Sequence, residues 1–434
     1  MITAHRSSLL HFLDDPSDRA SNAFEYYEDG LLVTENGLVS ACGEAASLMP
    51  RLTSGIKLIE HQNSLICPGF VDVHVHYPQL EVMASHGEEL LDWLARYTFP
   101  AEAKFADSDY AEACAERFLD ELLRVGTTTA LVFGTVHPNS VEAFFRACEM
   151  RKLRMISGKV MMDRNAPPEL LDSSEASYAD SKSLIESWHD KGRLRYAVTP
   201  RFAITSTSEQ LNFAGLLLKE HPGVYLHTHL SENRLEIESV RNLFPNAKNY
   251  LDAYDQSDLL GRRSVFAHCI HLEREEWSRL GASGSAVAHC PNSNLFLGSG
   301  LFSMKSAMEH GVRVGIGSDI GGGSELCILR ALADSYKVAR IRGENISPLK
   351  SFYLATLGGA KALDLADKIG NFLVGKEADF VVLDKEATPL IKYRLSICKN
   401  LEELLFSMTM LGDDRLVNET WIMGEKSHDR DAKF

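Results

Sequence analysis

The sequence lacks an apolar run long enough to cross a membrane, and no basic segment followed by an apolar stretch opens the chain. Its eight cysteines include no Cys-x-x-Cys pair, which favours reduced thiols in a reducing compartment. Basic residues are outnumbered, 45 against 60 acidic ones, so the formal charge is -15. Nucleic acids and anionic membranes call for a basic face. We therefore expect a cytoplasmic protein that binds neither nucleic acid nor membranes.

Low-complexity tracts and solenoid-type repeats are also missing, and the chain instead alternates strand-like and helix-like segments. Helical patterns separate most of the predicted strands, as in 109–124, where Phe118, Leu119 and Leu122 share one stripe. Eight strand–helix units predict an α/β fold with a (β/α)₈ TIM-type barrel. The eight predicted strands are 68–76, 126–133, 153–162, 194–199, 223–229, 264–268, 284–289 and 312–319.

The two ends of the chain differ from this alternation. A length of 434 residues with 45% hydrophobic content suits a barrel with an appended small domain. Strand-like stretches occur at 26–40 and 64–67, and again at 378–384 and 416–423. We predict a small β-sandwich domain built from residues 1–67 and 371–434, the latter including a tail, with the barrel at 68–370 between them.

Histidines and one aspartate lie at the ends of four predicted strands. His74 and His76 close the first strand, where residues i and i+2 point to the same face. His229 ends the fifth strand, His268 the sixth and Asp319 the eighth. The carboxyl ends of barrel strands meet at one face, so these side chains are expected to converge. Imidazole with one carboxylate suits zinc best, with iron or manganese as alternatives.

The segments around these residues resemble the amidohydrolase superfamily, through 68–76, 227–232, 267–269 and 317–319. A narrower resemblance to the guanine deaminases rests on 77–79, 91–94, 97–102, 199–202 and 289–294. The likeness extends over nearly the whole chain. It implies a homodimer and one zinc per subunit, with His227 as a supporting residue. The implied ligands are His74, His76, His229 and Asp319, with His268 either in looser metal contact or near the bound water.

The same resemblance implies hydrolytic deamination of guanine to xanthine and ammonia, as in purine catabolism. A zinc-bound hydroxide would attack C2, with Asp319 as the general base and His268 orienting the nucleophile. Glu232 lies three residues beyond His229. Its carboxyl group is expected to act as the proton shuttle, first to a ring nitrogen and then to the departing amine.

Substrate recognition needs groups that contact the edge of a purine, and the same resemblance nominates Gln79, Arg201 and Phe202. A guanidinium at Arg201 can donate to O6 and N7, and the amide of Gln79 offers both a donor and an acceptor. The ring of Phe202 can contact a flat heterocycle, and Trp93 either lines the pocket or packs in the core. The predicted substrate-binding residues are His76, Gln79, Arg201, Phe202, His229, Glu232 and Asp319.

Two alternatives remain at this stage. A related enzyme with the same chemistry could act on another aminated heterocycle, such as 8-oxoguanine, a pterin or a triazine. A scaffold protein could keep the barrel and use zinc for stability alone. The complete set of ligand and proton-transfer residues favours an enzyme over the scaffold.

Overall fold

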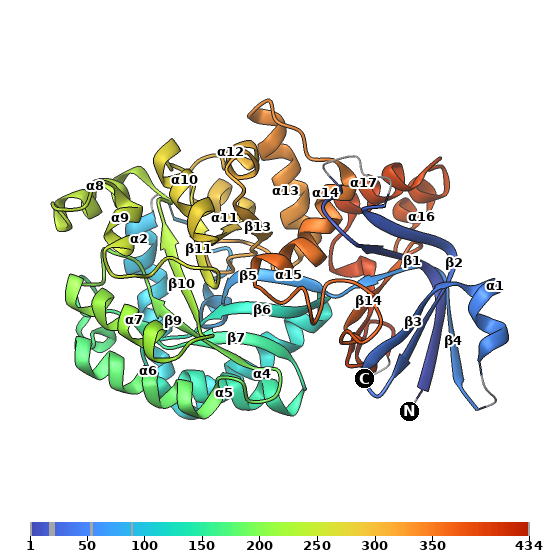
Figure 1. Cartoon of the computed structure of the whole chain (residues 1–434), viewed down its shortest axis with the longest axis horizontal. Helices are drawn as coiled ribbons and strands as arrows, with labels where there is room; N and C mark the ends of the chain where they lie inside the picture. The colour runs from blue at the N-terminus through green and yellow to red at the C-terminus, as the bar shows by residue number, and fades with distance from the viewer. Residues whose placement is uncertain (1, 17–21, 53–54, 88–89, 433–434) are drawn as a thin grey trace.

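The structure is a computed structural model that describes residues 2–16, 22–52, 55–87 and 90–432 (Figure 1). Its strands form two separate sheets, one of parallel strands and one of mixed direction. In Figure 1 the parallel sheet lies to the left among helices, and the mixed sheet lies to the right beside both chain ends. The predicted fold, a TIM-type barrel with a small β domain built from both termini, is confirmed.

The parallel sheet runs in sequence order from β5 to β13, with the short β8 pairing separately with β9. The predicted strand 153–162 is divided between β7 and β8. The two edge strands of this sheet, β5 and β13, also meet. The backbone N–H of Asp319, just after β13, donates to the carbonyl of His74 in β5 at 2.9 Å, which brings the eighth barrel strand next to the first. The strands are β5 (Phe70–His76), β6 (Thr127–Phe133), β7 (Arg154–Gly158), β8 (Val160–Met161), β9 (Arg195–Pro200), β10 (Tyr225–Leu230), β11 (Ser264–His268), β12 (Ala286–His289) and β13 (Arg313–Ile316).

Helices cover the outside of the barrel (Figure 1). The predicted helix 109–124 is α4, which starts where the Asp107 carboxylate accepts from the Tyr110 N–H and buries Phe118, Leu119 and Leu122. The longer barrel helices are α4 (Ser108–Arg124), α5 (Pro138–Met150), α6 (Ser174–Trp188), α7 (Ser208–Glu220), α8 (Arg234–Leu243), α10 (Arg274–Ser283) and α13 (Ile328–Ile341). Shorter ones are α9 (Tyr250–Asp255), α11 (Pro291–Phe296), α12 (Met304–Glu309), α14 (Pro348–Tyr353), η7 (Leu354–Gly358) and α15 (Gly359–Ala362).

A chain of short helical pieces follows β5 directly and leads to α4. It contributes Gln79, Leu90, Trp93 and Leu94 to the same pocket that the ends of the barrel strands line. The pieces are η3 (Tyr77–Val82), α2 (Leu90–Trp93), the π-helical η4 (Leu94–Thr98), α3 (Phe99–Ala103) and η5 (Lys104–Ala106).

The mixed sheet has the order β16-β15-β14-β4-β1-β2-β3, so strands from the two ends of the chain meet where β14 pairs with β4. The strand-like stretch 26–40 spans two strands, because Asn36 and Gly37 have positive φ values of 50° and 85° and reverse the chain between β2 and β3. The strands are β1 (Ile2–Phe12), β2 (Phe24–Glu35), β3 (Leu38–Glu44), β4 (Lys57–Pro68), β14 (Phe380–Asp384), β15 (Val417–Ile422) and β16 (Glu425–Asp429), with helices α1 (Ala45–Leu48), η2 (Met49–Arg51), α16 (Pro389–Ser396), α17 (Leu401–Leu411) and η8 (Asp414–Leu416). Among the described residues, no helix combines the length and apolar character that crossing a membrane requires.

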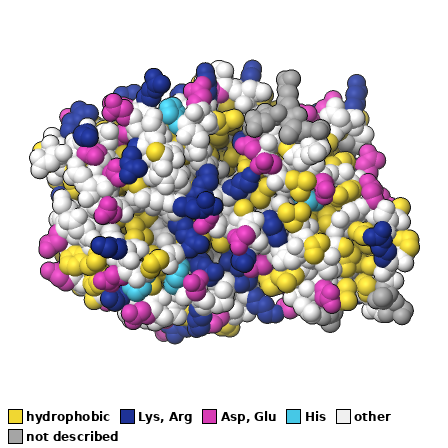
Figure 2. Space-filling view, in the orientation of Figure 1, with side chains coloured by type: hydrophobic (Ala, Val, Ile, Leu, Met, Phe, Trp, Pro, Cys, Tyr) yellow, Lys and Arg dark blue, Asp and Glu magenta, His cyan; other side chains and the backbone are white. Residues whose placement is uncertain are grey.

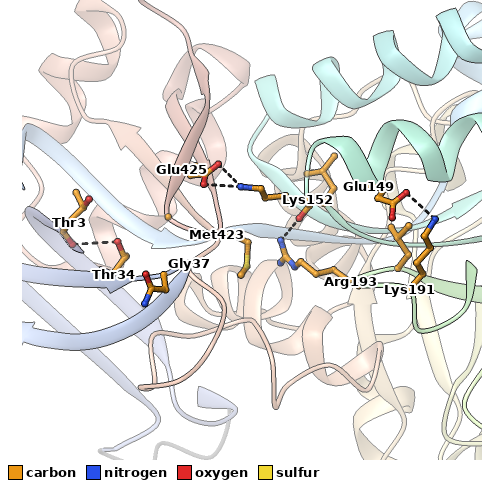
Figure 3. Close-up of a pocket in the computed structure, with 14 residues that line it drawn as sticks. Thr3, Thr34, Gly37, Glu149, Lys152, Lys191, Arg193, Met423 and Glu425 are labelled. Atoms are coloured by element: carbon orange, nitrogen blue, oxygen red, sulfur yellow. Dashed lines mark hydrogen bonds and ion pairs between the residues drawn. The ribbon is translucent and has the colours of Figure 1, made fainter. Parts of the chain in front are cut away.

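Ion pairs join the barrel to the mixed sheet along their seam. Figure 2 shows Lys and Arg side chains gathered near the centre of this face. The carboxylate of Glu377 accepts from Arg154 Nε at 2.6 Å and from Arg193 Nη2 at 2.7 Å, and Arg193 also pairs with Asp379. A cleft opens nearby, where Lys152 of the barrel contacts Glu425 of β16 at 2.9 Å (Figure 3).

We expect the substitution Glu377→Ala to lower the free energy of unfolding by about 3–5 kcal/mol, because it leaves Arg154 without its carboxylate partner and Arg193 with Asp379 alone. The side chains of Arg154, Arg193 and Glu377 are 4%, 11% and 11% exposed. Urea unfolding followed by circular dichroism measures the loss. The matched control is Glu425→Ala, which breaks an exposed pair and should cost less than about 1 kcal/mol. Equal stability of the two variants would show that the buried network does not hold the seam.

Candidate functional site

A pocket opens at the carboxyl ends of the barrel strands. The ends of β5, β9, β10, β11 and β13 each contribute to it, together with the helical pieces that follow β5. This is the face where the loops of a (β/α)₈ barrel gather functional side chains. The pocket is lined by His76, Gln79, Leu90, Trp93, Leu94, Arg201, Phe202, His229, Glu232, His268, Leu297, Asp319 and Gly322.

Four of the predicted ligands form a compact cluster that could hold a metal ion. One ligand atom from each of His74, His229, His268 and Asp319 lies within 4.8 Å of the others, and all four residues are buried. His74 Nε2 lies 3.1 Å from Asp319 Oδ1, close to the spacing of about 3.3 Å between ligand atoms around a tetrahedral zinc. Within the part of the chain that the structure describes, His74 Nε2 has no hydrogen-bond partner. A buried, unpartnered nitrogen beside a carboxylate fits a metal centre.

His76 lies outside this four-residue group but borders it closely. Its Nε2 is 3.3 Å from His229 Nε2 and 3.5 Å from Asp319 Oδ1. All five predicted ligands are therefore brought together around one centre. His268 Nε2 is 3.7 Å from Asp319 Oδ2 and 3.4 Å from Glu232 Oε2, so it faces both the cluster and the second carboxylate.

A second layer of contacts orients the imidazole rings. His229 Nδ1 donates to the backbone carbonyl of Arg201 at 2.6 Å, and His268 Nδ1 donates to Asn294 Oδ1 at 2.9 Å. His74 Nδ1 contacts His227 Nε2 at 2.7 Å. Each contact occupies Nδ1 and leaves Nε2 toward the centre, as outer partners of metal-binding histidines commonly do. His227 thus supports His74, although it shares a strand face with His229.

Burial sets the protonation of these histidines. It lowers the pKa of His74, His76 and His229 well below the ordinary value, so all three rings are neutral and can offer a lone pair to a metal. His268 behaves differently. Burial again acts to lower its pKa, but the carboxylates of Glu232 and Asp319 outweigh that effect and raise it.

Two site residues have backbones in the left-handed region, which is unfavourable for side chains other than glycine. The φ angle is 72° at His268 and 49° at Asp319, and Cys269 follows His268 with 53°. Each of these conformations costs of the order of 1–3 kcal/mol and persists where surrounding contacts impose it. At Asp319 the N–H bond to the His74 carbonyl supplies such a contact. His268 is the last residue of β11, whereas Asp319 lies three residues beyond the end of β13, and both belong to the cluster.

Glu232 is held at the edge of the cluster by contacts to its side chain and its backbone. Its Oε1 accepts from Ser299 Oγ at 3.3 Å, and its backbone N–H donates to Glu236 Oε2 at 2.8 Å. Glu236 is itself buried and accepts from Tyr250 Oη at 2.7 Å. Burial is the largest influence on Glu232 and raises its pKa to about 7. A carboxyl group with this pKa can take up and release a proton near neutral pH.

The predicted substrate-reading residues line the same pocket. Arg201 Nη1 donates to Glu102 Oε2 at 2.7 Å, and Gln79 Nε2 donates to Glu102 Oε1 at 3.0 Å. The Phe202 ring lies edge-on to His229, with centroids 6.3 Å apart. Trp93 lines the pocket and is also packed in the core, with its Nε1 donating to the Ser85 carbonyl.

Sequence reasoning missed two residues that shape the site. Glu102 and Asn294 both lie inside motifs that carried the family resemblance, at 97–102 and 289–294, but neither was given a role. An acidic residue in the apolar stretch Phe99–Ala103 is a signal for Glu102, since a buried carboxylate needs partners. Asn294 lies in α11, and its sequence position alone indicates no contact with His268.

Comparisons with known proteins agree with this geometry. Residues 65–426 match the Amidohydrolase family. The chain is 50% identical over 418 residues to the guanine deaminase of Escherichia coli strain K12, which covers 96% of this chain and 95% of that protein. A solved structure of E. coli guanine deaminase superposes with a TM-score of 0.97, at 49% identity, covering 99% of this chain and all of that one. A guanine deaminase from C. acetobutylicum, with guanine bound in its active site, gives a TM-score of 0.88 at 28% identity over 98% of this chain and 100% of that one.

We expect the purified protein to bind one divalent metal ion per chain and His229→Ala to lose most of it, because that change removes a ligand at the centre of the cluster. Metal content by plasma mass spectrometry after dialysis measures this. His137→Ala is the control, since His137 is part-buried at the start of α5 and outside the cluster. Full metal content in His229→Ala would place the metal elsewhere.

Proposed function

We propose that this chain, which belongs to the amidohydrolase family, hydrolyses guanine to xanthine and ammonia with one zinc ion per subunit. The single observation that carries the proposal is the shared pocket. It joins the metal-binding cluster, the buried Glu232 and the pair Arg201 and Gln79. The guanine deaminases that the chain resembles, one of them with bound guanine, support the choice of substrate.

The proposed chemistry distributes proton transfer between two carboxylates. The cluster of His74, His229, His268 and Asp319 would hold a divalent cation, which would lower the pKa of water toward about 7 and so supply a nucleophile at neutral pH. Asp319 accepts a proton from the attacking water, and His268 orients that water through Nε2. Glu232 protonates a ring nitrogen as the water oxygen bonds to C2. The Glu232 carboxylate then takes the proton of the new C2 hydroxyl and carries it to the amino group, so that C2=O forms as the C2–N bond breaks and ammonia leaves. The proton held by Asp319 passes to Glu232, which restores both groups.

Recognition of guanine is assigned to the pocket residues Arg201, Gln79 and Phe202. Arg201 donates to the acceptors O6 and N7, and Gln79 hydrogen-bonds the ring amide. Phe202 contacts the ring, and His76, His229, Glu232 and Asp319 border the carbon that reacts. The geometry supports this assignment because all seven residues line one pocket.

Ammonia release from a panel of heterocycles tests the substrate. The zinc-loaded protein is incubated with guanine, 8-oxoguanine, pterin, melamine and adenine, and products are identified by chromatography. Selective release from guanine with formation of xanthine is the expected result. Preference for another compound would leave the proposed reaction type standing but would contradict guanine as the substrate. If no compound releases ammonia, a structural role for the metal is favoured.

Glu232→Gln should lower kcat for guanine by about 10²–10⁴-fold, because the amide cannot carry the proton that general acid–base catalysis requires. Its metal content should equal that of the wild type, since Glu232 is not among the expected ligands. Steady-state ammonia release and mass spectrometry give the two values. Glu238→Gln, an exposed position on the nearby α8, is the matched control. Wild-type kcat in Glu232→Gln would assign proton transfer to another group.

We further propose that the protein is a cytoplasmic homodimer whose catalytic unit is residues 68–370, with 1–67 and 371–434 forming the small domain. All eight cysteines are free thiols, which supports a reducing compartment. Size-exclusion chromatography with light scattering tests the dimer, with a mass of twice 48.2 kDa expected. A mass of 48.2 kDa would show a monomer.

A further inference from the structure

We propose that Glu102 is a positioning residue that determines which heterocycles the pocket accepts. By orienting Arg201 and Gln79, Glu102 favours heterocycles in which a carbonyl oxygen lies next to a ring N–H, as in a lactam. This inference rests on the proposed function, because it names the feature of the substrate that the same pocket recognises.

One buried carboxylate holds both substrate-reading side chains. Glu102 is 1% exposed and lies on α3, within the helical pieces that follow β5. Its Oε1 accepts from Gln79 Nε2 at 3.0 Å and from Arg201 Nη1 at 2.9 Å, and its Oε2 accepts from Arg201 Nη1 at 2.7 Å. The orientations of the Gln79 and Arg201 side chains therefore both depend on Glu102.

Arg201 is held on two sides by α3. Besides the ion pair with Glu102, its guanidinium carbon lies 5.5 Å from the ring centroid of Phe99, three residues earlier on the same helix. Arg201 is 2% exposed, and a buried guanidinium needs a counter-charge. Glu102 supplies this negative charge by accepting from Arg201 Nη1. The ligand therefore does not have to carry a negative charge. The pocket can therefore hold a neutral ring, to which Arg201 presents hydrogen-bond donors.

The contact with Glu102 also fixes which way the Gln79 amide points. A carboxylate only accepts hydrogen bonds, so the NH₂ group of Gln79 must face Glu102. Its oxygen then points away, toward Gly321, where a Cβ atom would lie 2.0 Å from Oε1. Gly321 has a φ of 108°, which disfavours any side chain there. The contact with Glu102 therefore favours one orientation of the amide. Because Gln79 lines the pocket, the proposal assigns its oxygen as the acceptor for a ligand.

This arrangement offers guanidinium donors beside a single amide acceptor. A ring with C=O next to N–H satisfies both groups, as guanine does at C6 and N1. An aminated ring such as adenine presents the reverse order at that edge, an NH₂ donor next to an unprotonated nitrogen. Its binding would leave buried polar groups unpaired, which is costly.

Competitive inhibition of guanine deamination by the zinc-loaded enzyme separates this role from a general structural one. Hypoxanthine keeps the C6 carbonyl and the N1–H, whereas purine lacks both. In Glu102→Gln we expect the Ki of hypoxanthine to rise about 10- to 100-fold, because the substitution removes the charge-assisted hydrogen bonds that orient Arg201 and Gln79. The Ki of purine should stay within about threefold, because purine does not use that edge.

Two further variants control the experiment. Glu102→Asp keeps the charge and should give a smaller but equally selective rise; it carries the test alone if Glu102→Gln does not fold. Glu81→Gln alters a partly exposed carboxylate that pairs with Lys104 on the same helical pieces, and both Ki values should stay unchanged. If the substitution weakens both inhibitors equally, or weakens neither, the role of Glu102 is overturned. The proposed function still stands in that case, provided that the wild type deaminates guanine. A wild type that leaves guanine unchanged would overturn both.

Discussion

The closure between the first and last barrel strands is the constraint on which the rest of the site depends. The N–H of Asp319 bonds to the carbonyl of His74, so two of the candidate ligands are fixed relative to each other by the backbone. The Asp72 carboxylate reinforces this junction by accepting from the backbone N–H groups of His74 and Ser318 and from the Ser318 hydroxyl. A shift in strand register at this point would separate the ligands without altering any of them.

One outer contact of the cluster links it to the rest of the pocket. The backbone carbonyl of Arg201 orients His229, while the side chain of the same residue lies in the substrate pocket. The loop after β9 therefore serves both halves of the site. Because His74, His76 and His229 are buried and neutral, they add no charge at the centre. The charge there is set by Asp319, Glu232, the protonation of His268, whose pKa is raised, and whatever cation binds.

The sequence alone was sufficient to predict the barrel and the convergence of the ligands, because both follow from local patterns. Alternation puts His74 and His76 on one face, and the strand predicted at 264–268 has the bounds observed for β11. The contacts of Glu102 with Gln79 and Arg201 could not be predicted this way. Its partners lie 23 and 99 residues away, and no periodicity relates a carboxylate on one helical piece to a guanidinium after β9. Likewise, β1 was not predicted, since its pairing with β2 and β4 is long-range.

The mixed sheet is assembled from strands that are far apart in time as well as in sequence. Residues Ser64 to Pro68 of β4 pair with Asp384 to Phe380 of β14, and the whole barrel is synthesised between them. Until β14 leaves the ribosome, β4 presents an unpaired edge that includes Leu65, Ile66 and Cys67, all buried in the finished sheet. A chain that stops within the barrel keeps this apolar edge exposed. The order of synthesis therefore makes the pairing of β4 with β14 one of the last steps in which this sheet can be completed.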